Sequence, residues 1–158
     1  MDSEKLKEFG TKALLSTAGI IGINVLGVND KIRSVLPNSV LTPHLSSGAG
    51  YTLVKAGVDM GYKGESVFQK QLIDVSDDVA FYTGLSLGVN TIQINDKVYD
   101  ALGNFVGNSQ LQYNLTEGLT VASGSILADV LDQTTGDNIV FDMIRKPVST
   151  TLKLLNKN

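Results

Sequence analysis

An internal repeat is the feature that most limits how this chain can fold. Residues 17–40 recur as residues 83–106, and a shift of 66 positions makes nine of the 24 residues identical, including the Asn-Asp-Lys triplet at 29–31 and 95–97. Beyond this block, a two-residue insertion aligns Gly50 with Gly118. Such repeats usually copy one supersecondary unit. With only 158 residues, each half is too small to be stable alone, so the repeat predicts one domain made of two halves.

Each repeat contains two apolar segments, which we expect to be short helices. The first segments, 13–28 and 79–94, are sixteen residues long and carry no charge; the second are 48–62 and 118–131. Sixteen helical residues cover about 24 Å, less than the roughly 30 Å of a bilayer core, so a crossing needs helical flanks. The predicted fold is mainly α, a membrane-associated bundle of four short apolar helices. The alternative is an α+β fold with hairpins around 95–113 and 130–144.

The expected organisation follows from these segments. Residues 1–158 form one domain, with repeat 1 at about 13–62, a connector at 63–76, repeat 2 at about 79–132 and a tail at 133–158.

Composition and charge placement both favour a membrane. Charged residues make up 18% of the chain, sixteen residues are glycine and the net charge is −3, while mean hydropathy is +0.10; low charge and high glycine fit a membrane or a closely packed assembly. If all four segments cross, nine basic residues share one side with both termini and three lie opposite, as the positive-inside rule predicts. The nine are Lys5, Lys7, Lys12, Lys63, Lys70, Arg145, Lys146, Lys153 and Lys157, and the three are Lys31, Arg33 and Lys97.

Small residues and two amides are the candidate helix contacts. Ala18 and Gly22 lie four residues apart in the first copy, as Gly84 and Gly88 do in the second, a spacing that lets helix backbones approach in lipid. This spacing is also frequent by chance in a glycine-rich chain. Two matched amides follow, and we expect them to face one another because a buried amide needs a partner; a role in binding a ligand is the alternative. These amides are Asn24 and Asn90.

Three ionisable residues in the second segments are candidate buried charges. Lys55 and Asp59 are four residues apart and share a helix face, so they can pair, and Asp129 lies in the other repeat. At depth in a membrane, such residues indicate an ion or proton pathway. The favoured interpretation is a contact with other protein or with the interface.

The sequence contains little that indicates catalysis. There is no cysteine and one histidine, His44, which we expect in a loop without a role. No metal-ligand spacing, phosphate loop or dinucleotide motif is present, and the net negative charge without a basic stripe argues against nucleic-acid binding. We therefore predict no catalytic residue, cofactor, metal or small-molecule substrate, and no enzyme.

Three functions remain open. The first is a non-enzymatic integral membrane scaffold bound to lipid and to other proteins of an assembly, possible copies of itself included; a minor structural protein of a membrane-containing virion, in its internal membrane, would be one setting. The second is a subunit of a small oligomeric transporter or channel, because duplicated halves are common in transporters. The third is a soluble interaction protein whose apolar segments form its core.

Overall fold

The computed structural model describes residues 2–63 and 72–134, and in these ranges all regular secondary structure is α-helical. The mainly α prediction is therefore confirmed. The hairpin alternative at 95–113 is wrong, because this range forms a helix and the start of the next; most of 130–144 lies outside the described residues. The helices are α1 (Ser3–Val25), α2 (Val28–Val35), α3 (Thr42–Lys63), α4 (Leu72–Thr91), α5 (Ile94–Gly103) and α6 (Ser109–Thr134).

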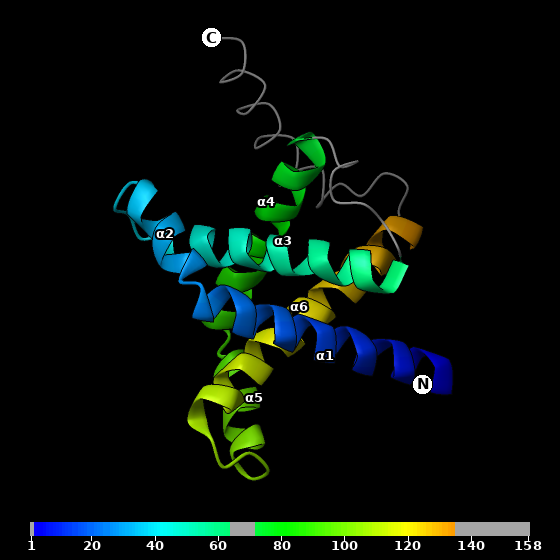
Figure 1. The fold of residues 1–158 in the computed structure, drawn as a ribbon. Coiled ribbons are helices and arrows are strands. Elements are labelled where there is room, and N and C mark those ends of the chain that lie inside the picture. Colours follow the sequence, from blue (N-terminus) through cyan, green and yellow to red (C-terminus); the bar gives the residue numbers. More distant parts are fainter. Residues whose placement is uncertain (1, 64–71, 135–158) are drawn as a thin grey trace.

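The two halves pack together by exchanging helix partners, so that each long helix has its largest contact with a helix of the other half. The most extensive contacts are between α1 and α6 and between α3 and α4, so the first long helix of each expected repeat lies against the last helix of the other (Figure 1). Both pairs are antiparallel: Lys12 of α1 bonds Asp129 near the end of α6, whereas Asn24 bonds Asn114 near its start. Neither half could bury its helix faces without the other.

Both first helices break at the same repeat position. Gly27 has φ +61° and Gln93 has φ +56°, the only positive-φ residues in the described ranges, and they are 66 positions apart. The N–H of Gly27 donates to the Asn24 carbonyl and that of Gln93 to the Asn90 carbonyl. The Asn-Asp-Lys triplets follow these breaks directly and begin the short helices α2 and α5.

Gln93 offers a direct test of this break. A left-handed backbone is strained for a residue with a Cβ but not for glycine. We expect Gln93→Gly to raise the free energy of unfolding by about 0.5–1 kcal/mol, and Gly27→Gln to lower it by a similar amount. Denaturant titration followed by circular dichroism measures both; a loss of stability in Gln93→Gly would contradict the assigned strain.

Glycines allow the exchanged helices to touch at two matched points. A Cβ added to Gly48 would lie 2.7 Å from the Thr83 backbone nitrogen, and one added to Gly118 would lie 2.8 Å from the Thr17 nitrogen. The two threonines are 66 positions apart but the two glycines are 70 apart. The matched contacts thus correspond to a four-residue insertion and not to two. Four residues turn a helix by about 400° and keep its buried face, whereas two would turn it by about 200°.

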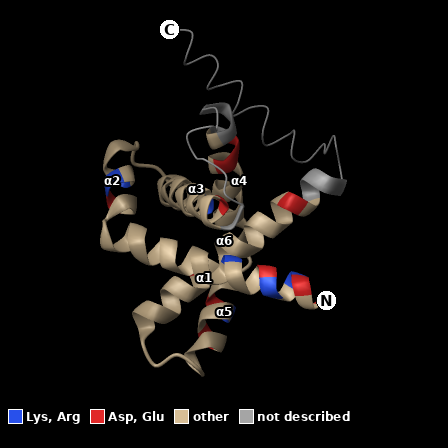
Figure 2. Ribbon diagram, turned by 45° about the vertical axis from the view of Figure 1, so that its right-hand side comes forward, with Lys and Arg blue, Asp and Glu red and all other residues tan. Residues whose placement is uncertain are grey.

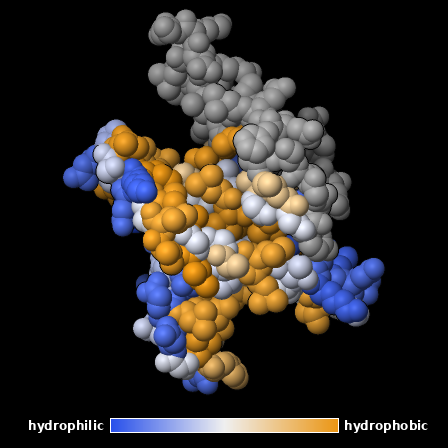
Figure 3. Space-filling model, viewed as in Figure 1, coloured by the Kyte–Doolittle hydropathy of each residue, from blue (hydrophilic) through white to orange (hydrophobic). Residues whose placement is uncertain are grey.

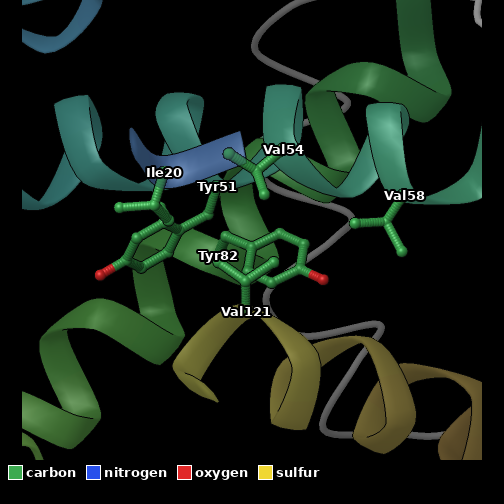
Figure 4. Close-up of a cluster of buried hydrophobic side chains, with 6 residues drawn as sticks. All are labelled: Ile20, Tyr51, Val54, Val58, Tyr82 and Val121. Carbon is green, nitrogen blue, oxygen red and sulfur yellow. The ribbon is translucent and has the colours of Figure 1, made fainter. Parts of the chain in front are cut away.

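Many of the buried side chains are polar, and many of the large apolar side chains are exposed. Among described residues, thirteen polar or charged side chains and seven apolar ones are buried, while nineteen large apolar side chains are exposed. Figure 3 shows apolar surface extending over much of one face. The apolar core is small; Figure 4 shows its members Ile20, Tyr51, Val54, Val58, Tyr82 and Val121 between the helices.

The structure changes the expected segment limits. Helix α1 begins at Ser3, ten residues before the apolar segment at 13–28, and ends at Val25. Of the connector expected at 63–76, residues 72–76 belong to α4, and the tail from 135 onward lies outside the described residues. Taken singly, none of the described helices has the length and apolar character for a membrane crossing; α1 and α2 together do, but they meet at a 61° bend.

Candidate functional site

A polar cavity lies between the two halves, beside α2 and α5. Its volume is about 260 Å³, and residues from α2, α3, α4, α5 and α6 line it. We name it the axial pocket, because matched positions of the two repeats meet there: Arg33 with Tyr99, Pro43 with Tyr113, and Ser47 with Glu117. The other lining residues are His44, Tyr51, Ser86, Asn90, Asn95, Asp96 and Thr116.

The two halves contribute different chemistry to the axial pocket. At the position where α3 carries the small hydroxyl of Ser47, α6 carries the carboxylate of Glu117, and where α5 carries Tyr99, α2 carries the cation Arg33. The two halves therefore present different side chains at matched positions of the pocket. In duplicated transporter folds, binding sites occupy this kind of location.

Glu117 is the central ionisable group of the pocket. The hydroxyl of Tyr51, itself buried, donates a hydrogen bond to Oε2 of Glu117. No described residue donates to the other oxygen, Oε1. Glu117 is partly buried, whereas Arg33 and Asp96 are exposed at the mouth. The pocket thus has an acidic interior and a mouth with one charge of each sign.

We expected His44 in a loop, but it lies in the first turn of α3. Its Nδ1 is 3.2 Å from the hydroxyl oxygen of Ser86 on α4. Nucleophilic catalysis would need a third group to orient the ring and backbone N–H donors for an oxyanion. No described residue bonds the other ring nitrogen, and Ser86 lies inside a helix, where N–H groups are already bonded. This pair alone gives no support to hydrolysis.

A second group of ionisable residues, the charged cluster, lies at the opposite end of the bundle. Lys12 is fully buried and its ammonium lies 2.9 Å from Glu8 and 3.0 Å from Asp129. Burial alone would lower the pKa of Lys12, but hydrogen bonds to Glu8 and Asp129 and their charges outweigh it and raise that pKa above its usual value. Lys12 therefore stays charged.

The other part of the charged cluster centres on Lys55. Its ammonium is 3.3 Å from Asp59 on the same helix and 3.3 Å from Asp78 on α4. Asp59 is buried and Lys55 is largely covered. The expected i, i+4 pair is thus present, and it extends to a third residue. Figure 2 shows such charges near the starts of α1 and α4, near the end of α6 and on α2 and α5.

Two tyrosines separate the axial pocket from the charged cluster. The rings of Tyr51 and Tyr82 meet edge to face with centroids 6.2 Å apart, and their hydroxyls point in opposite directions (Figure 4). The Tyr51 hydroxyl bonds Glu117. The Tyr82 hydroxyl is buried and has no hydrogen-bond partner among described residues.

Most of the predicted helix-contact residues do not lie at the closely packed helix contacts. Added Cβ atoms at Gly22, Gly84 and Gly88 would meet nothing within 4 Å, and Ala18 is exposed. Within the described ranges, then, these three glycines make no close contact with another helix. The close contacts are made by other glycines. Gly48 and Gly118 touch the opposite half, whereas Gly19, Gly50 and Gly124 touch helices of their own half.

The two matched amides do not face each other. The amide nitrogen of Asn24 donates to Oδ1 of Asn114 at 2.9 Å, whereas Asn90 is exposed and lines the axial pocket. The expectation that Asn24 pairs with Asn90 is therefore wrong, because α1 packs against α6 and not against α4.

Sequence reasoning missed Glu117, Tyr51 and Arg33. Glu117 has a recognisable signal, since it is the only charge between residues 109 and 128, and a lone charge in an apolar segment indicates a functional site. Among described residues, no group of three or more His, Asp or Glu side chains is arranged to hold a metal.

Comparison with known proteins gives no relative: no family model, curated protein or solved structure matches the chain.

Proposed function

We propose that this chain is a non-enzymatic scaffold protein, embedded in a membrane and held within a larger assembly. The observation that carries the proposal is that, among described residues, most buried side chains are polar while nineteen large apolar side chains are exposed. In water, a monomer rarely exposes apolar patches larger than a few hundred Å². In lipid, an apolar exterior is favourable, and buried Ser, Thr, Asn and charged side chains hold helices together by bonding one another.

The distribution of charge along the helices supports the same proposal. Residues 13–29 and 79–95 carry no charge, and each stretch runs from the charged cluster to the short helix at the other end. The long helix accounts for thirteen residues of each stretch, 13–25 and 79–91, which extend about 20 Å, so a crossing of the roughly 30 Å bilayer core also needs the flanking residues. Their moderate apolarity follows from inward-facing polar residues such as Ser16 and Thr17, which are buried.

Membrane partition tests the proposal. We expect the expressed protein to sediment with membranes, to resist extraction at high pH and salt, and to become monodisperse only in detergent. Purification in mild detergent from the native source should bring other assembly proteins with it, and capsid proteins among them would favour a virion. Recovery as a monodisperse monomer without detergent would reject the proposal in favour of a soluble interaction protein.

A membrane topology with both termini on one side is part of the proposal. The start of α1 lies beside the end of α6, and three basic residues lie at the other end, on α2 and α5. Because the chain has no cysteine, single-cysteine variants can be labelled cleanly. Cysteines that replace Lys5 and Lys153 should react with a label from one side of the membrane, and a cysteine that replaces Lys97 from the other. Lys153 lies outside the described residues. Reaction of Lys5 and Lys153 variants from opposite sides would reject this topology.

Transport is the second candidate, favoured by the axial pocket at the meeting of the two halves and by the charged cluster beyond the tyrosines. Reconstitution into liposomes without partner proteins tests it. Selective ion flux that Asp129→Asn removes, and that the exposed-site control Asp30→Asn keeps, would replace the scaffold proposal with a channel or transporter. Absence of flux in a folded, inserted preparation supports the scaffold.

A further inference from the structure

We propose that the axial pocket binds the headgroup of a zwitterionic phospholipid, with the ammonium group inside against Glu117 and the phosphate at the mouth against Arg33. The inference rests on the proposed membrane location, which brings headgroups to the ends of the helices. Among the lining residues, only Asn90 received a ligand-binding role from the sequence, as an alternative.

The interior of the pocket is suited to an ammonium group. Oε1 of Glu117 accepts no hydrogen bond from described residues, while Tyr51 fixes the other oxygen. A partly buried carboxylate is costly without a cation. Tyrosine rings also line the cavity at Tyr99 and Tyr113, and aromatic rings attract ammonium and quaternary ammonium groups through their negative faces.

The mouth of the pocket is suited to a phosphate. Arg33 is exposed on α2 and lines the cavity, and its guanidinium can bind two phosphate oxygens at once. Asp96, also at the mouth, is the one lining acid that disfavours a phosphate there. A headgroup entering with its ammonium first leaves its phosphate at the mouth and its acyl chains outside.

The size and position of the pocket agree with this ligand. Its volume of about 260 Å³ is just below the roughly 300–1,000 Å³ of small-molecule sites, which suits a fragment of headgroup size. The neighbouring helices α2 and α5 have no fully buried residues and carry both charges and exposed apolar side chains, namely Val35 and Ile94. Such helices lie at the boundary between headgroups and acyl chains.

Lipid binding to the detergent-purified full chain tests the proposal. The probes are nanodiscs or mixed micelles that contain phosphatidylethanolamine, phosphatidylcholine or, for comparison, anionic phosphatidylglycerol, with retained lipid counted by native mass spectrometry. We expect zwitterionic lipid to be preferred, and Glu117→Gln, which keeps the shape and the bond to Tyr51, to weaken its binding by about tenfold or more. Asp30→Asn is the matched control, because it removes one carboxylate from an exposed site outside the pocket and should change nothing.

Soluble probes separate the two halves of the ligand and its two sources. Glu117→Gln should weaken binding of both phosphoethanolamine and tetramethylammonium, whereas Arg33→Gln should weaken only the former. Binding of phosphoethanolamine equal to that of the lipid would assign the site to a free metabolite and overturn the lipid proposal. An unchanged probe affinity in Glu117→Gln would also overturn the proposal. A gain in probe affinity in Arg33→Gln would overturn it as well, because Arg33 would then be the internal partner of Glu117. These outcomes are independent of membrane partition, so the inference can fail while the scaffold proposal stands.

Discussion

Alanine at Gly48 or Gly118 should lower the free energy of unfolding by about 1–3 kcal/mol, the usual range for overpacking. The new methyl group would meet backbone atoms of Thr83 or Thr17 at 2.7–2.9 Å, so the helices themselves must separate. The threonines cannot turn away freely, because each hydroxyl donates to a carbonyl of its own helix. Because the two contacts are matched, the two variants should lose similar amounts, measured by denaturant titration in detergent.

Two glycines provide matched controls for these variants. Gly84 and Gly88 also lie inside a long helix, but a methyl group there meets nothing within 4 Å. Their alanine variants should be as stable as the parent or slightly more, since alanine favours helix by up to about 1 kcal/mol. Equal losses at Gly48 and Gly84 would contradict the exchanged packing. Loss of assembly without loss of folding in Gly84→Ala would assign this residue to contact with another chain.

Truncating Tyr82 should have the largest effect of any core substitution. Its side chain is fully buried and its ring packs edge to face against Tyr51 and against Phe81, the latter with centroids 5.1 Å apart. Tyr82→Ala should therefore destabilise the fold by about 3–5 kcal/mol, as for other large aromatic deletions. Thermal or denaturant unfolding in detergent measures the change.

Tyr82→Phe isolates the hydroxyl group. That hydroxyl is buried without a hydrogen-bond partner among described residues, and such a group costs about 1–3 kcal/mol. We expect the phenylalanine variant to equal or exceed the parent in stability. A loss comparable to that of Tyr82→Ala would mean that the hydroxyl has a partner, such as a bound water that joins it to the charged cluster.

Because the two halves exchange helix partners, the axial pocket and the charged cluster both depend on how the halves meet. The axial pocket is built from both repeats, and so is each end of the charged cluster: α1 with α6, and α3 with α4. A change in how the halves meet therefore alters the pocket and the cluster together. Tyr51 and Tyr82, one from each half, fill the space between them.

Local sequence patterns determine the helices, the repeat and the charge-free stretches of this protein. The two sixteen-residue segments without charge lie largely in the long helices α1 and α4, and left-handed breaks recur at Gly27 and Gln93 because the residues around them were copied together. An i, i+4 charge pair within a segment could likewise be read directly, as Lys55 and Asp59 illustrate.

Tertiary structure decides which face of each helix is buried, and therefore where the site lies. The candidate contacts Gly22, Gly84 and Gly88 are open, while Gly48 and Gly118 touch the opposite half, because burial depends on which helix is the partner and at what rotation. The four-residue insertion sets that rotation. An alignment of the repeats with a two-residue insertion would instead place the opposite face of the helix against its partner. Glu117 and Tyr51 are 66 positions apart, so only the pairing of the two halves could bring them together.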